Sequence, residues 1–195
     1  MHPLKAPGPD GLPALFFQKY WHIVGREVQD LALSILNTGE QPHDINKTFL
    51  VLIPKGKNPS TPKDFRPISL CNVVMKIVTK AITNRLKHTL GDVIDIEQNA
   101  FVQGRLITDN ALIAMECFHW LKKKGKGEKG VMALKLDMSK AYDRVEWQFV
   151  YQALISIGYP VKIVDLIWRC ISSVSYQILI NGQPSKSFTP ERGLQ

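Results

Sequence analysis

The sequence lacks several features that assign proteins to particular classes. It has no run of about 18 apolar residues, and its first residues, MHPLKAPGPDG, lack the apolar core of a signal peptide. Its cysteines, Cys71, Cys117 and Cys170, stand far apart without a C-x-x-C pair, so the spacing indicates neither a zinc site nor a disulfide framework. We therefore expect a soluble intracellular protein, nuclear or cytoplasmic, that binds no membrane.

Acidic side chains are also in short supply. Lysine and arginine total 25 against 17 aspartates and glutamates, which gives a formal net charge of +8. This balance favours a phosphate-rich partner, above all nucleic acid. The 195 residues, 45% of them hydrophobic, are enough for one ordinary domain with a core. A short lysine-rich run at 122–130 is typical of a solvated linker that adds salt-sensitive affinity for nucleic acid.

The first third of the chain predicts a loop, a helix and a pair of strands. KAPGPDGLP is a turn-forming cluster, and apolar residues then recur at three- and four-residue intervals from Pro13 to Gly39, which predicts one long amphipathic helix. Residues 48–53 (TFLVLI) predict a buried strand. A basic, turn-rich segment follows and leads to a second short strand around Ile68 and Leu70. Together these segments predict a strand, loop, strand finger.

Helices dominate the expectations for the remainder. Periodic apolar residues predict helices beginning at Asn72 and near Thr108 or Asp109, both good N-caps. Further segments predict a buried strand at 131–136, helices at 147–157 and 161–171, and a hairpin that turns at Asn181-Gly182. Strands and helices alternate irregularly, which favours an α+β fold.

Asp137 stands where the predicted buried strand would reach the surface. Residues 131–136 are apolar apart from Lys135, and a carboxylate at such a place requires a cation or backbone donors. One alternative is that Asp137 caps the following turn through the amides of Ser139 and Lys140. Another is an aspartate-nucleophile phosphatase, but such an enzyme typically has a second aspartate two residues on, where this chain has Ser139.

Four motifs in order carry a resemblance to a known family. They are KAPGPDG at 5–11, DFRPISL at 64–70, QNAFVQGRLITDNALIAME at 98–116, and LDMSKAYDRVEW at 136–147, which contains D-x-x-x-A-Y-D. Together they resemble the reverse transcriptase of LINE-type non-LTR retrotransposons, particularly the kind abundant in plant genomes. The resemblance covers essentially the whole chain.

The resemblance implies an incomplete right-hand polymerase. Residues 1–130 would form a fingers-like region with an N-terminal extension motif, and 131–195 would begin the palm. In the family, further catalytic aspartates come from a Y/F-A-D-D hairpin that follows a QGDP-type motif, and this sequence contains neither. The chain thus ends before the second and third catalytic motifs, and we expect that it does not polymerise by itself.

The first catalytic motif supplies the metal-binding expectation. Nucleotidyl transfer uses two divalent cations about 4 Å apart, and Mg²⁺ prefers hard oxygen ligands. By resemblance Asp137 is the catalytic carboxylate and a magnesium ligand, helped by the backbone carbonyl of Met138. Tyr142 corresponds to the steric gate that excludes a ribose 2′-hydroxyl, with ordinary core packing as the alternative. Asp143 is expected to bond nearby backbone groups.

Basic residues supply the remaining candidates. Lys55 and Arg66 bracket the finger loop, where they are expected to bind the triphosphate of the incoming nucleotide. The choice among Lys55, Lys57 and Lys63 stays open, and a solvated basic loop is the alternative. Arg105 is the candidate for contact with the template backbone, with a structural role at the entry of a helix as the alternative.

The function implied by the resemblance is RNA-directed DNA synthesis. Its partners would be an RNA template, a DNA primer and deoxynucleoside triphosphates, with Mg²⁺ as cofactor. The alternative is a non-catalytic remnant or repurposed module that binds nucleic acid, which the missing A-D-D motif favours.

Overall fold

The computed structural model describes residues 1–38, 40, 42–124 and 130–194. The chain divides into two compact units. One unit comprises Met1–Ile82 together with Lys140–Gln195 and holds the sheet, so we call it the sheet unit. The other comprises Thr83–Ser139 and is called the helical unit.

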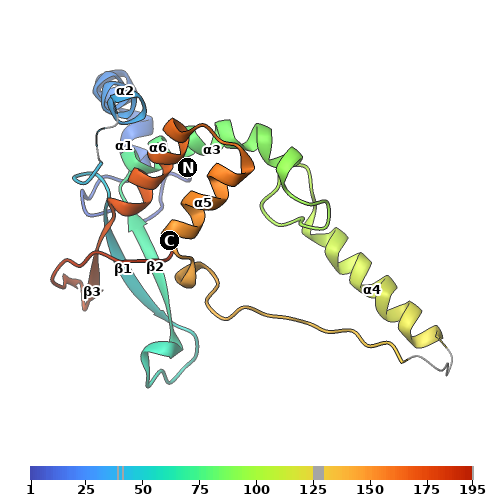
Figure 1. Cartoon of the computed structure of the whole chain (residues 1–195). Coiled ribbons are helices and arrows are strands. Elements are labelled where there is room, and N and C mark those ends of the chain that lie inside the picture. Colours follow the sequence, from blue (N-terminus) through green and yellow to red (C-terminus); the bar gives the residue numbers. More distant parts are fainter. Residues whose placement is uncertain (39, 41, 125–129, 195) are drawn as a thin grey trace. The chain divides into compact units, whose positions relative to one another are not determined.

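The sheet unit is built on four strands in the order β2-β1-β3-β4. Strand β1 (Lys47–Pro54) pairs antiparallel with β2 (Phe65–Cys71) and parallel with β3 (Ser175–Ile180), which in turn pairs with β4 (Gln183–Pro184). In Figure 1 the β1–β2 pair runs out beyond the helices of this unit and carries its connecting loop at the far end. The predicted strand, loop, strand finger is therefore confirmed.

The burial predicted for β1 is wrong along most of its length. Thr48 is buried, whereas Leu52 and Ile53 are exposed. The pairing explains the difference, because β3 accompanies β1 only as far as Val51 while β2 continues to Pro54. The outer half of β1 thus belongs to a two-stranded ribbon, which leaves apolar side chains open to solvent.

The turn between β3 and β4 forms as predicted. Asn181 and Gly182 both have positive φ, 51° and 79°, which is the requirement of a type I′ hairpin turn. The parallel pairing of β3 with β1 was not predicted, because the two strands stand far apart in the chain and neither carries a local signal for its partner.

The first predicted helix is two helices. Helix α1 (Ala14–Lys19) ends at Tyr20, whose φ of −108° and ψ of 22° leave the helical region, and α2 (Trp21–Thr38) begins directly after it. Pro13 precedes α1 instead of occupying its first position, and Gly39 lies outside the described residues. The break allows both helices to contribute to one core cluster, which contains Ala14, Phe17, Val28 and Val73.

Three further helices follow their predicted ranges. Helix α3 (Val73–Val93) buries residues of its first half, Val73, Met75, Val78 and Ile82. Helices α5 (Trp147–Ile157) and α6 (Val161–Ser172) flank Gly158, whose left-handed φ of 100° ends α5.

Polar contacts join these helices to each other and to the sheet. The Tyr151 hydroxyl donates to Asp165 Oδ1 at 2.9 Å, and the Tyr151 ring meets the Trp168 ring edge to face. Buried Asn46, next to β1, donates from Nδ2 to the Cys170 carbonyl and the Ser173 hydroxyl, each at 2.8 Å. Asn46 therefore ties the end of α6 to the start of β1.

The helical unit contains α4 (Ile107–Lys123), which buries none of its residues. Its N-cap position is Leu106, so the predicted caps Thr108 and Asp109 lie inside the first turn instead. The lysine-rich run that follows α4 lies largely outside the described residues, since 125–129 are not among them.

The predicted buried strand at 131–136 is wrong. These residues are extended, carry no ladder hydrogen bonds and are exposed, with Leu134 at 73% and Leu136 at 82% exposure. A strand needs a neighbour for its backbone groups, and within the described part of the chain no strand lies beside this segment. Its apolar side chains therefore stay exposed to solvent, and Figure 1 draws the segment as extended chain.

Candidate functional site

The loop between β1 and β2 is closed at its base by Lys55. The Lys55 amide donates to the Asp64 carbonyl, and its Nζ donates to the Lys63 carbonyl, both at 2.7 Å. The ammonium group thus braces the loop from inside. Of the three candidate lysines, Lys55 is the one whose ammonium group donates a hydrogen bond to a protein carbonyl, that of Lys63.

Asp64 organises the other side of the same loop. The amides of Thr61 and Ser60 donate to Asp64 Oδ2 at 2.8 and 3.0 Å, and the Thr61 hydroxyl donates at 3.1 Å. These bonds to the charged form, led by the one from the Thr61 amide, hold the pKa of Asp64 below its usual range. Among the described residues this carboxylate forms no salt bridge with a neighbouring cation.

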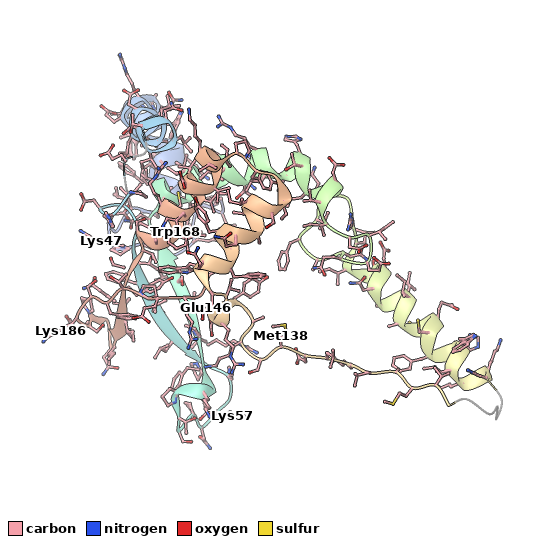
Figure 2. All side chains as sticks on the ribbon, in the orientation of Figure 1. Lys47, Lys57, Met138, Glu146, Trp168 and Lys186 are labelled. Carbon is pink, nitrogen blue, oxygen red and sulfur yellow. The ribbon has the colours of Figure 1, made fainter. Side chains whose placement is uncertain are left out.

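Three cations of the finger are left for a ligand. Arg66 lies on β2 opposite Ile53 and is exposed, and Lys63 lies in the loop itself. Lys57 also lies in this loop, as Figure 2 shows. Among the described residues none of these three side chains has an ion-pair partner. An Arg fork beside two lysines on an exposed ribbon can bind phosphate oxygens.

Tyr142 stands on a short 3-10 turn, Tyr142–Arg144, that is held by the end of the described chain. The Leu194 amide donates to the Tyr142 carbonyl, and the Gly193 amide donates to the Val145 carbonyl, both at 2.9 Å. The Tyr142 side chain is 57% exposed. Tyr142 therefore does not pack in the core of the sheet unit, which was the alternative to the steric gate.

Side chains reinforce this connection, which we call the 192–194 latch. Trp147 Nε1 donates to the Gly193 carbonyl at 2.8 Å, and Arg192 Nη1 donates to Glu146 Oε1 at 3.2 Å. Gly193 has a φ of 92°, and a Cβ there would lie 3.1 Å from the Asp143 carbonyl oxygen. The latch therefore requires glycine for its backbone and for its close approach.

Asn72 holds the N-terminal KAPGPDG motif in place. The sequence predicted Asn72 only as the start of a helix. Its Oδ1 accepts from the Asp10 amide at 3.2 Å, and its Nδ2 donates to the Ile45 carbonyl at 3.1 Å. A Cβ on Gly8 would lie 2.2 Å from Asn72 Oδ1. Gly8, between two prolines in KAPGPDG, was the available signal. A glycine at such a place is typical of a close approach by other atoms, because it has no Cβ.

Arg105 is occupied within the helical unit. Its guanidinium donates to three backbone carbonyls, those of Ile94 at 3.1 Å, Gln98 at 2.7 Å and Asp95. It therefore links the segment after α3 to the turn that precedes α4. Contact between Arg105 and a template stays a prediction.

Asp137 and Met138 also belong to the helical unit, whereas Lys55, Arg66 and Tyr142 belong to the sheet unit. Asp137 is exposed, and Met138 has 78% exposure. No group of three or more histidine, cysteine, aspartate or glutamate side chains gathers among the residues that the structure describes. Asp137 and the Met138 carbonyl are thus hard oxygen donors that belong to no such group among the described residues.

The described helices were compared with the length and hydropathy of membrane-spanning helices. None of the described helices combines the length and apolar character needed to cross a membrane.

Comparison with known proteins identifies the family. The model of the family "Reverse transcriptase (RNA-dependent DNA polymerase)" matches residues 53–195. The chain is 31% identical over 98% of its length to the "Transposon TX1 uncharacterized 149 kDa protein" of Xenopus laevis, and covers 14% of that protein. It is 28% identical over 98% of its length to the "Retrovirus-related Pol polyprotein from type-2 retrotransposable element R2DM" of Drosophila melanogaster, and covers 17% of it.

A third relative has a similar name. The chain is 25% identical over 97% of its length to the "Retrovirus-related Pol polyprotein from type-1 retrotransposable element R2" of Nasonia vitripennis, and covers 18% of it. The chain thus spans less than a fifth of the length of these three proteins. The predicted resemblance to retrotransposon reverse transcriptases and the α+β fold are confirmed, while the likeness to plant elements stays a prediction. The chain belongs to the reverse transcriptase family.

Proposed function

We propose that this chain is part of a retrotransposon protein that copies RNA into DNA. Its ligands would be an RNA template, a DNA primer and deoxynucleoside triphosphates. The observation that carries the proposal is the D-x-x-x-A-Y-D motif at 137–143, which lies inside the residues matched by the family. In this proposal residues 1–130 form the fingers region, and 131–195 begin the palm.

The finger would bind the triphosphate of the incoming nucleotide. Arg66, Lys57 and Lys63 have no ion-pair partner among the described residues and share one exposed ribbon. Arg66 can hold two phosphate oxygens at once, and the lysines add point charges. Lys55 is positioned to keep the loop closed through its bond to the Lys63 carbonyl, which uses one of the three donors of its ammonium group.

Tyr142 would act as the steric gate against ribonucleotides. Its exposed ring stands on a backbone that the 192–194 latch holds at the Tyr142 carbonyl. A fixed backbone sets the point from which the ring projects, and discrimination against a single hydroxyl depends on placement of the ring. Arg105 would support the template side by ordering the turn before α4, and contact between its side chain and a phosphate is the alternative role.

Asp137 and the Met138 carbonyl would bind a divalent cation. Their oxygen donors suit Mg²⁺, which binds through one or two carboxylates and retains substrate phosphates and water. When bound, the two ions of such a site would supply activation of the primer hydroxyl and stabilisation of the charge on the departing pyrophosphate. One carboxylate is a partial ligand set, and the 195 residues contain no A-D-D motif to complete it. We therefore propose that this chain alone does not polymerise.

Primer extension tests the proposal. A parent protein that contains this chain and an A-D-D hairpin is expected to add deoxynucleotides to a DNA primer on an RNA template when Mg²⁺ or Mn²⁺ is present. The matched reaction with the 195-residue chain is expected to give no product. Failure of the parent to extend any primer on RNA, with binding of the primer-template intact, would contradict the proposal.

A second function is favoured by the net charge of +8. The chain would then be a nucleic-acid-binding module without catalysis. Primer extension by the wild-type parent separates the two, because the parent of a binding module shows no synthesis. Fluorescence anisotropy with labelled RNA is expected to show that the module keeps its salt-dependent affinity in Asp137→Asn. The enzyme also keeps binding in Asp137→Asn, but its parent loses synthesis.

A further inference from the structure

The loop between β1 and β2, residues 55–64, is held without a hydrophobic core of its own. Residues 55–63 are exposed, and Asp64 at the end of the loop is half-buried. A loop that buries no apolar side chain keeps one conformation only where hydrogen bonds impose it. The polar contacts within this loop therefore decide where its cations lie.

These contacts converge on one carboxylate oxygen. Asp64 Oδ2 accepts hydrogen bonds from the amides of Thr61 and Ser60 and from the Thr61 hydroxyl. The Asp64 amide in turn donates to the Thr61 carbonyl at 3.0 Å and closes the 3-10 turn Pro62–Asp64. Hydrogen bonds to a charged acceptor are roughly twice as strong as neutral ones. Asp64 thus fixes the backbone on either side of Lys63.

Two cations project from the backbone that these bonds hold. Lys63 lies in the turn itself, and its carbonyl also accepts from Lys55 Nζ at 2.7 Å. Arg66 follows two residues after Asp64, near the start of β2. Both side chains are exposed, and neither has an ion-pair partner among the described residues. A backbone that is already fixed lowers the entropy that such side chains lose when they bind an anion.

We propose that Asp64 is a positioning residue for phosphate binding by this loop. The inference rests on the proposed function, in which the cations of the finger bind the triphosphate of the incoming nucleotide. Asp64 acts through the turn that carries Lys63 and through the strand that begins beside it with Arg66. By charge alone, a carboxylate near bound phosphates is unfavourable. The hydrogen bonds that Asp64 accepts give this carboxylate its role in the loop.

Charge and positioning predict opposite effects of substitution. If Asp64 acted only through its charge, its removal would take a negative group away from the phosphates and tighten nucleotide binding. If Asp64 acts by positioning, its removal leaves the amides of Ser60 and Thr61 without their acceptor, so the turn loosens and binding weakens. Asp64→Asn separates the two effects, because its amide oxygen can accept the same bonds without the charge.

Steady-state primer extension tests the proposal in a parent protein that contains this chain and an A-D-D hairpin. Asp64→Ala is expected to raise the KM for the deoxynucleoside triphosphate about tenfold, because several bonds to a charged group are lost. Its kcat is expected to stay within about twofold of the wild-type value, because the metal-binding groups are unchanged. In Asp64→Asn the KM is expected to stay within about threefold of the wild-type value.

Asp44→Ala is the matched control. Asp44 is an exposed aspartate of the sheet unit that pairs with Lys47, away from the loop, so its removal is expected to leave KM and kcat unchanged. Urea unfolding checks that every variant is folded. An unchanged or lowered KM in Asp64→Ala, a loss confined to kcat, or equal increases of KM in Asp64→Ala and Asp64→Asn would each overturn the proposal.

A second measurement does not depend on DNA synthesis. Tripolyphosphate is titrated into the 195-residue chain at fixed low salt, and NMR follows the backbone amides of residues 55–64. Asp64→Ala is expected to weaken the affinity about tenfold, whereas Asp44→Ala leaves it unchanged. If this order is found but the wild-type parent makes no product, the proposed function fails and the role of Asp64 stands. If the parent makes DNA and Asp64→Ala leaves both KM and tripolyphosphate affinity unchanged, the role of Asp64 fails alone.

Discussion

The indole Nε1 of Trp147 donates a hydrogen bond to the carbonyl oxygen of Gly193 at 2.8 Å. This bond joins the first residue of α5 to the last described residues of the chain, and it stands beside the two backbone bonds that hold Tyr142 and Val145. The turn that bears the proposed steric gate is thus fixed by residues that are distant in the sequence.

Trp147→Phe tests the side-chain part of this connection. The change retains most of the buried ring but leaves the Gly193 carbonyl without its indole donor, so the free energy of unfolding is expected to fall by about 1 kcal/mol. Urea denaturation measures it. Trp120→Phe is the matched control, because the Trp120 ring is exposed on α4, and it is expected to change the stability by less than about 0.5 kcal/mol. Equal losses in the two variants would contradict the role of this bond.

Gly193→Ala tests the backbone of the latch. An alanine must adopt the φ of 92° and must also place its Cβ 3.1 Å from the Asp143 carbonyl oxygen, so we expect a loss of roughly 2 kcal/mol or more. Gly182→Ala shares a positive φ but has open space around its Cβ, and is expected to cost only about 1 kcal/mol. If thermal or urea unfolding ranks the two variants equally, the contact with Asp143 carries no energy.

The pH dependence of the finger loop should follow Asp64. Its folded-state pKa lies below the ordinary value, so this contribution to stability is present above the unfolded pKa of about 3.9 and is lost as the pH falls through the folded value. Carboxyl NMR titration is expected to show the depressed pKa, and amide exchange at Ser60 and Thr61 should accelerate over the same acidic range. In Asp64→Asn, amide exchange at Ser60 and Thr61 should no longer depend on pH over that acidic range. A normal pKa for Asp64 would contradict the bonds described.

The cysteines should differ in reactivity. Burial raises the pKa of the Cys170 thiol to about 11, whereas Cys117 is exposed on α4. The thiolate is the reacting species, so at pH 8 iodoacetamide is expected to alkylate Cys117 well before Cys170. Peptide mapping by mass spectrometry follows both sites in one sample. Prior addition of urea should remove the difference, and fast labelling of Cys170 in the folded chain would contradict its burial.

Local patterns predicted most elements of the sheet unit. The finger, α5, α6 and the Asn181-Gly182 turn each carry their signal within a few residues, and each was found where it was expected. The parallel neighbour of β1 and the 192–194 latch were not predicted, because they join residues far apart in the chain. The segment at 131–136 also shows that a local pattern does not determine pairing with a distant strand. Its pattern is that of a strand, but a strand forms only where a neighbour pairs with it.

The candidate site was predictable as a set of residues and only partly as an arrangement. The family motifs marked Arg66 and Tyr142 as candidates and the finger loop marked Lys55, and all three belong to the sheet unit. The match to the family covers the residues of the three later motifs. The sequence could not show that Lys55 bonds to the Lys63 carbonyl or that Arg105 bonds to three carbonyls. Such bonds depend on the backbone path, which composition and spacing do not determine.

The most direct test of the central claim compares two aspartates of one motif. In a parent protein that contains this chain and an A-D-D hairpin, deoxynucleotide incorporation on an RNA template is measured for Asp137→Ala and Asp143→Ala, with RNA binding measured for both. The account predicts that Asp137→Ala lowers incorporation by more than about a hundredfold with binding retained, because a metal ligand is lost, while Asp143→Ala retains most of its activity. Incorporation that survives Asp137→Ala would contradict the assignment of Asp137 as the catalytic carboxylate.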